Sequence, residues 1–130
     1  MPRYLSEDWI DAADRALSSD PSMAEATAGI RLVVQQTVTE APSGDLVYRV
    51  EIDDGTVHVI AGEARTPDVS FTQTWATACA VARGELSAQG AFMSGRVQIR
   101  GDLGALVEHG PALAGVTDVL AGLRVETDYD

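Results

Sequence analysis

Three residues of this sequence carry side chains that often act as nucleophiles, bases or metal ligands: Cys79, His58 and His109. A cysteine acts as a thiolate, and a histidine transfers protons or binds a metal near neutral pH. Cys79 lies among alanines in an apolar stretch, which is typical of an inert buried thiol. The pattern places His58 in the middle of a strand beside a hairpin and His109 near a helix end, and structural or exposed roles account for both positions.

The motifs that would complete an active site are absent from the sequence. It contains no H-E-x-x-H, no G-x-S-x-G, no glycine-rich phosphate loop after a strand and no EF-hand spacing. A lone cysteine excludes an internal disulfide and a cysteine metal cluster, and two histidines are too few for most histidine-rich sites. The sequence therefore predicts a protein that is not an enzyme and has no metal or cofactor. An enzyme that uses His58 or His109 remains an alternative, which activity screening of His→Ala variants would decide.

Hydrophobic periodicity indicates which elements must position these side chains. The predicted helices cover residues 6–20, 22–28, 74–83, 86–93, 102–107 and 113–123. The predicted strands alternate polar and apolar residues and cover 30–39, 46–53, 56–61, 69–74 and 96–100. Ser6 and Asp102 are placed to cap helices. The first four strands predict an antiparallel meander with one wet and one covered face, and the whole pattern predicts an α+β fold with a five-stranded sheet.

The charge of the chain limits its partners. Nine arginines and no lysines stand against twenty acidic residues, which gives a net charge of −11. Such a chain repels phosphate backbones and anionic membranes, so we expect no nucleic-acid partner and at most transient membrane contact. Acidic residues occupy the N-terminal region where a signal peptide needs an apolar run, and no stretch approaches the ~18 apolar residues of a membrane span. We expect a cytoplasmic protein.

The second half of the chain is more hydrophobic than one covered sheet face requires. Residues 75–81 and 103–123 combine a broad apolar surface with many alanines and glycines. Small residues permit close helix packing, or they leave space for an apolar guest. The pattern alone leaves both interpretations open.

Three segments resemble the sterol carrier protein 2 (SCP-2) family. They are PDVSFT at 67–72, ARGEL at 82–86 and AFMSGRVQIRGD at 91–102. The last segment is the most specific, and the resemblance covers about residues 25–124, preceded by an N-terminal helix. We therefore expect residues 1–130 to form a single SCP-2-like lipid-binding domain. The resemblance implies a five-stranded, mostly antiparallel sheet covered by helices, with an apolar tunnel between sheet and helices.

The resemblance also implies a function. It predicts an intracellular lipid-binding and lipid-transfer protein that holds a sterol, a fatty acid, an acyl-CoA or a similar apolar ligand. The alternative is a non-catalytic subunit or interaction module that presents a lipid-like substrate to a partner enzyme. Copurified lipid would favour the carrier, and copurified protein the subunit. Two departures from the family pattern concern the helices: Ala88 replaces a common proline, and Gly110-Pro111 interrupts the C-terminal helix that often closes the tunnel.

The residues expected to line the tunnel are apolar or small and come from the second half of the chain, where many of them could equally be plain core. They are Trp75, Ala78, Cys79, Ala82, Phe92, Met93, Val97, Ile99, Leu103, Leu106, Leu113, Val119, Leu120 and Leu123.

Overall fold

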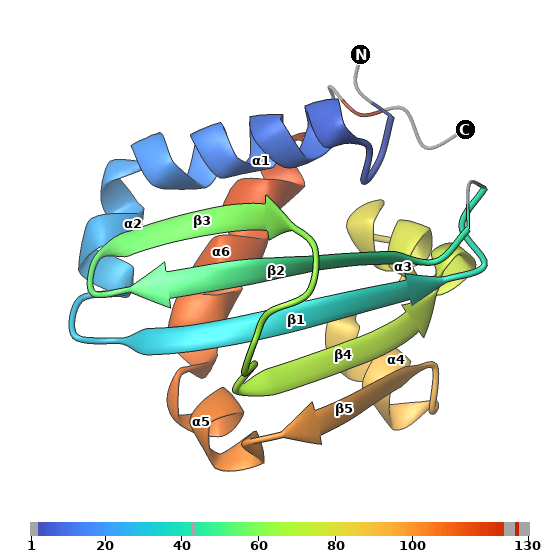
Figure 1. Ribbon diagram of the computed structural model, residues 1–130. Helices are drawn as coiled ribbons and strands as arrows, with labels where there is room; N and C mark the ends of the chain where they lie inside the picture. The colour runs from blue at the N-terminus through green and yellow to red at the C-terminus, as the bar shows by residue number, and fades with distance from the viewer. Residues whose placement is uncertain (1–2, 43, 124–126, 128–130) are drawn as a thin grey trace.

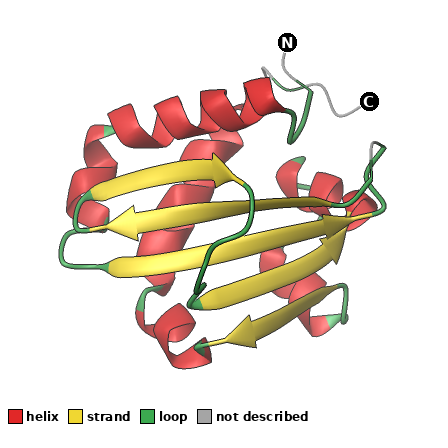
Figure 2. Ribbon diagram, viewed as in Figure 1, coloured by secondary structure: helices red, strands yellow, loops and turns green. Residues whose placement is uncertain are grey.

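A five-stranded sheet with helices against one of its faces forms the framework of the protein in the computed structural model (Figure 1; Figure 2). The structure describes residues 3–42, 44–123 and 127. The helices are α1 (Glu7–Ser19), α2 (Pro21–Ala26), α3 (Trp75–Ala82), α4 (Ala88–Met93), α5 (Leu103–Glu108) and α6 (Gly110–Ala121). The strands are β1 (Arg31–Thr39), β2 (Leu46–Asp53), β3 (Thr56–Ala61), β4 (Val69–Thr74) and β5 (Val97–Gly101). The predicted α+β class and five-stranded sheet are confirmed.

The strand order differs from the expected meander. The order is β3-β2-β1-β4-β5, so β1 lies at the centre of the sheet. β1 pairs antiparallel with β2 but parallel with β4, and the remaining pairs are antiparallel. The predicted meander is therefore wrong at its last step, because β4 lies beside β1 and not beside β3. Alternation reports which face of a strand is covered, whereas the partner of β4 depends on contacts between residues far apart in the sequence.

The connection from β3 to β4 makes this rearrangement possible. Residues 62–68 cross β2 and β1 on the face of the sheet away from α6 (Figure 1). Polar side chains of that face hold the crossing segment. The Arg49 guanidinium donates to the carbonyl oxygens of Gly62 and Glu63 at 3.4 Å each, and the Gln35 side-chain oxygen accepts from the Ala64 N–H at 3.0 Å.

Asp68 fixes the start of β4 against two other strands. Its backbone N–H donates to the Val33 carbonyl at 2.9 Å, and its carboxylate accepts from the Val33 N–H at 2.7 Å. Its carbonyl oxygen accepts from the Asp102 N–H at 2.8 Å, just after β5. Gly101 has a φ of 107°, and a Cβ on it would overlap that same carbonyl oxygen. One residue thus joins β1, β4 and the end of β5.

Helix α1 covers the β3 edge of the sheet. The Ser6 hydroxyl caps it by accepting from the Trp9 N–H at 3.2 Å, as predicted. The Asp14 carboxylate accepts from the Val59 N–H at 2.9 Å and so ties the helix to β3. Its apolar face packs against β3 and α6 and contains Trp9, Ile10, Ala13 and Leu17.

The later helices follow the expected start and stop signals. The Asp102 carboxylate caps α5 by accepting from the Ala105 N–H at 3.0 Å, which confirms the predicted cap. α6 is the exception, because it begins at Gly110 and not at Leu113 as predicted. Gly110-Pro111 forms the first turn of α6, and His109 alone separates it from α5. α6 then packs against α1 and α2.

Replacement of Gly101 by alanine should weaken the sheet more than the same change elsewhere. The left-handed backbone costs an alanine roughly 1–2 kcal/mol, and the overlap with the Asp68 carbonyl adds to it. We expect Gly101→Ala to lower the free energy of unfolding by about 3 kcal/mol or more. Gly95→Ala is the control, because Gly95 has a φ of 78° but open space around it, and should cost about 1 kcal/mol. Equal losses in denaturant titrations would contradict the close approach at Asp68.

Candidate functional site

The sheet face that is turned toward the helices, here called the inner face, is covered unevenly. Over β2 and β3 it is buried at Val50, Ile52, Val57 and Val59, which are all at most 6% exposed. Toward β4 and β5, the apolar side chains of Phe71, Val97 and Ile99 are only half-buried. The helices therefore leave part of an apolar sheet face accessible.

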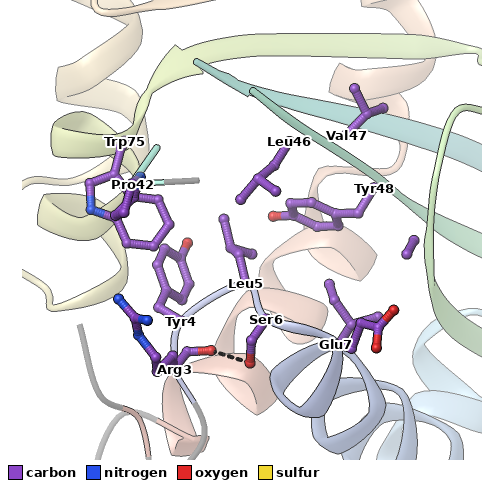
Figure 3. A pocket seen from close by; sticks show the side chains of 12 residues that line it. Arg3, Tyr4, Leu5, Ser6, Glu7, Pro42, Leu46, Val47, Tyr48 and Trp75 are labelled. Atoms are coloured by element: carbon purple, nitrogen blue, oxygen red, sulfur yellow. Dashed lines mark hydrogen bonds between the residues drawn. The ribbon is translucent and has the colours of Figure 1, made fainter. Parts of the chain in front are cut away.

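A pocket of about 610 Å³ opens beside this inner face, between the N-terminal segment, the start of β2 and the start of α3 (Figure 3). Its volume falls within the range of small-molecule sites. Most of its wall is apolar, and the charged lining residues are Arg3 of the N-terminal segment and Glu7 at the start of α1. The lining residues are Arg3, Tyr4, Leu5, Ser6, Glu7, Ile10, Pro42, Leu46, Val47, Tyr48, Ala61 and Trp75.

The N-terminal segment forms one wall of the pocket through an unusual backbone. Leu5 has a φ of 62°, in the left-handed region that most residues avoid. The turn is held because the Ser6 hydroxyl donates to the Arg3 carbonyl at 2.7 Å while also capping α1. The Tyr4 ring packs on the rings of Trp9 and Trp75, at centroid distances of 5.1 and 5.4 Å. These contacts fasten the segment across α1 and α3.

Tyr48 contributes the polar group that points into the pocket from the sheet. Its ring extends from β2 and its hydroxyl is directed toward Leu46 and Leu5 in Figure 3. Among the described residues, no hydrogen bond is made by this hydroxyl. Burial raises the pKa of the Tyr48 phenol above its usual range, so the group remains a neutral hydrogen-bond donor at physiological pH.

The predicted lining residues fall into three groups. Trp75 lines the pocket, and Ala78 and Cys79 are buried in the core below it. A second group is half-buried and consists of Ala82, Val97, Ile99, Leu106, Leu113, Val119, Leu120 and Leu123. A third group is exposed: Phe92 (50%), Met93 (76%) and Leu103 (50%). Of the predicted residues, Trp75 alone belongs to the pocket of Figure 3, and contact of the others with a ligand stays a prediction.

The sequence-based list lacks the residues that form most of the pocket. Leu46 and Tyr48 carry a usable signal, because alternation along residues 46–53 places both on the covered face of the sheet. Leu5 and Tyr4 carry none, since residues 3–6 have no periodicity and contact the sheet only through the turn that precedes α1.

The environment of Cys79 matches that of a structural thiol. Its side chain is buried in α3 at 5% exposure. Burial raises the pKa of the Cys79 thiol, although the Arg83 guanidinium acts in the opposite direction; Glu85 adds a smaller rise. The thiolate population at neutral pH is therefore reduced, which weakens the residue as a nucleophile.

Neither histidine lies at the pocket. The His58 Nδ1 atom is 2.9 Å from the Asp14 carboxylate on the outer side of β3, and His109 lies between α5 and α6. Within residues 3–42, 44–123 and 127, no group of three or more His, Cys, Asp or Glu side chains is arranged to hold a metal ion. The helices of this part of the chain are also too short or too polar to cross a membrane.

Solved structures share this fold. A conserved hypothetical protein of Thermus thermophilus superposes with a TM-score of 0.75 at 20% identity, over 95% of this chain and 91% of that chain. A sterol carrier protein 2 also superposes with a TM-score of 0.75 at 20% identity, over 92% of this chain and 98% of that one. The sec-alkylsulfatase Pisa1 from Pseudomonas sp. has a TM-score of 0.52 at 18% identity, over 74% of this chain but only 14% of the enzyme.

A match between the sequence and a protein-family model identifies the family of this chain. None of the curated proteins matches this chain in sequence. The model of the SCP-2 sterol transfer family, in contrast, matches residues 11–113, which span α1 to the first turn of α6. The match includes all five strands and the segment 91–102 on which the resemblance rested. The chain therefore belongs to the SCP-2 sterol transfer family.

Proposed function

We propose that this chain is a non-catalytic lipid carrier that binds one elongated apolar molecule between the inner face of the sheet and the helices. The observation that carries the proposal is the 610 Å³ pocket, together with an inner face left partly accessible over β4 and β5. Trp75, which directly follows β4, is one of the lining residues of the pocket. A monomer with no ligand gains nothing from accessible apolar surface, since burial from water contributes about 25 cal/mol per Å². A bound lipid would recover that free energy.

Trp75 connects the two parts of the proposed site. It lines the pocket and begins α3, and Cys79 lies one helical turn further along the same side of that helix. We propose that a ligand chain runs from the pocket past Trp75 toward the half-buried residues of β4, β5 and α6. Transfer through water would then be favoured by about 0.8 kcal/mol for each methylene that the protein covers.

A second function is a subunit or module that presents a lipid-like substrate to a partner enzyme. The similarity to 14% of the alkylsulfatase Pisa1 supports it, because a fold of this kind there forms part of a larger enzyme. Mass spectrometry of the purified chain under native conditions separates the two functions: the carrier should retain a small apolar molecule, and the subunit should retain a protein.

A charge placed in the pocket should abolish binding without unfolding the protein. Leu46 is half-buried and lines the pocket, so the carboxylate of Leu46→Asp would meet the ligand chain but remain hydrated when the pocket is empty. We expect this variant to lose affinity for a fluorescent long-chain alcohol by about tenfold or more. Its melting temperature should fall only modestly.

Phe92→Asp is the matched control, because Phe92 is 50% exposed on α4. We expect it to fold and to change the affinity by less than about twofold. A loss of binding in Phe92→Asp alone would place the ligand along the residues predicted from the sequence and not in the pocket of Figure 3.

Ligand should slow modification of the thiol. Cys79 lies four residues after Trp75, so a ligand chain that passes Trp75 would cover it. We expect N-ethylmaleimide to react more slowly with lipid-loaded protein than with delipidated protein. The raised pKa of the Cys79 thiol means that both rates should increase with pH across the neutral range. Equal rates in the two forms would exclude Cys79 from the ligand path.

A further inference from the structure

Three polar side chains interrupt the inner face of the sheet, and none of them is charged: Gln36, Tyr48 and Gln73. The strand registers and the burial pattern place them on the face that is turned toward the helices. The other inner-face positions are apolar or glycine and are Leu32, Val34, Val38, Leu46, Val50, Ile52, Val57, Val59, Ala61, Val69, Phe71, Val97, Ile99 and Gly101.

The three polar side chains form a continuous row across β2, β1 and β4. Gln36 lies directly opposite Tyr48 in the antiparallel register. The Gln73 side-chain N–H donates to the Gln36 side-chain oxygen at 3.4 Å. We call this set the polar row. One end of it lies at the pocket, where Tyr48 forms part of the lining, and at the other end Gln73 precedes Trp75 by two residues.

The polar row contains hydrogen-bonding groups that have no partner among the described residues. No fully buried side-chain polar atom of the described residues lacks a hydrogen-bond partner, so any unpaired group of the row is open to solvent and can be reached by a ligand. Among the described residues, the Tyr48 hydroxyl has no hydrogen bond, and the Gln36 side-chain N–H groups and the Gln73 side-chain oxygen have no partner beyond the one bond that joins the two amides. The row thus offers donors and an acceptor side by side, next to an apolar pocket.

We propose that the polar row binds the uncharged, oxygen-bearing head of the ligand, so that the chain selects lipids with a hydroxyl or carbonyl group over lipids with an ionised head. This inference rests on the proposed carrier function. A hydroxyl group both donates and accepts, which matches the row, whereas an ionised carboxylate would lose its hydration with no cation in the row to compensate.

The charges around the pocket agree with a neutral head. Arg3 and Glu7 are the only charged residues among the described residues that line the pocket, so the lining carries no net charge. In Figure 3 the Arg3 side chain lies beyond Tyr4 and Leu5 as seen from the Tyr48 hydroxyl. The net charge of −11 adds a repulsive field for any anion.

The test compares three molecules that share a sixteen-carbon alkyl chain and differ in their heads: hexadecanol, hexadecanoate and hexadecane. Each is used to displace a fluorescent apolar probe from the full-length protein at mildly alkaline pH. In the unmodified protein we expect hexadecanol to bind at least about tenfold more tightly than hexadecanoate. Tyr48→Phe should lower the affinity for hexadecanol by about fivefold to tenfold, because it removes one hydrogen bond to the ligand. It should leave the affinity for hexadecane unchanged, because it keeps the ring. Thr72→Val, which removes a hydroxyl from the opposite face of β4, should not alter this selectivity.

The outcomes separate this inference from the carrier function. If hexadecane binds but hexadecanoate binds as tightly as hexadecanol, the carrier function stands and the polar row does not select the head. If Tyr48→Phe lowers the affinities for hexadecanol and hexadecane equally, the role of Tyr48 in binding the head is likewise overturned. If none of the three molecules displaces the probe, the carrier function fails and the inference fails with it. The selectivity of the unmodified protein needs no variant, so the inference is testable even if Tyr48→Phe does not fold.

Discussion

The parallel pairing of β1 with β4 is the contact on which the rest of the architecture depends, and Asp68 holds it in place. This residue binds Val33 through its backbone and its carboxylate, and its carbonyl oxygen accepts from the backbone just beyond Gly101. If β4 lay beside β3, β5 would be displaced to the other edge of the sheet. The segment 91–102, which carries the family motif, would then lie away from the helices that it now adjoins.

This pairing also explains why the inner face is less covered near β5. The hairpin of β2 and β3 packs against α1 through β3, and its inner-face side chains Val50, Ile52, Val57 and Val59 are buried. β4 and β5 lie on the other side of the central strand, where the shorter helices α3 and α4 pack. Short helices bury less surface, so Phe71, Val97 and Ile99 keep part of their area accessible.

The elements of this fold could be predicted from local patterns, but their long-range arrangement could not. Caps such as Ser6 and Asp102 are local, because the side chain bonds a backbone group three residues away. The strand faces were also predictable, and they place Tyr48 among the covered residues. The partner of β4 was not, since the crossing segment is held by Arg49 and Gln35 from other strands.

The candidate site was only partly predictable for the same reason. A family motif and an apolar residue type do not determine how many neighbours cover a side chain on a short helix. Phe92 and Met93 are exposed in the structure, and their predicted contact with a ligand stays a prediction. The wall formed by Leu5 depends on a left-handed backbone that the residue type does not indicate.

The carboxylate of Asp14 on α1 not only holds this helix against β3 but also protects the edge of the sheet. It occupies the Val59 N–H on the outer side of β3, a strand at the sheet edge. The opposite edge, β5, is five residues long, begins just after the exposed Arg96 and contains the exposed Arg100. Free edge strands recruit strands from other molecules and start aggregation, and short, charged or occupied edges resist this. Both edges of this sheet are therefore protected against the addition of a foreign strand, even though part of its apolar inner face stays accessible.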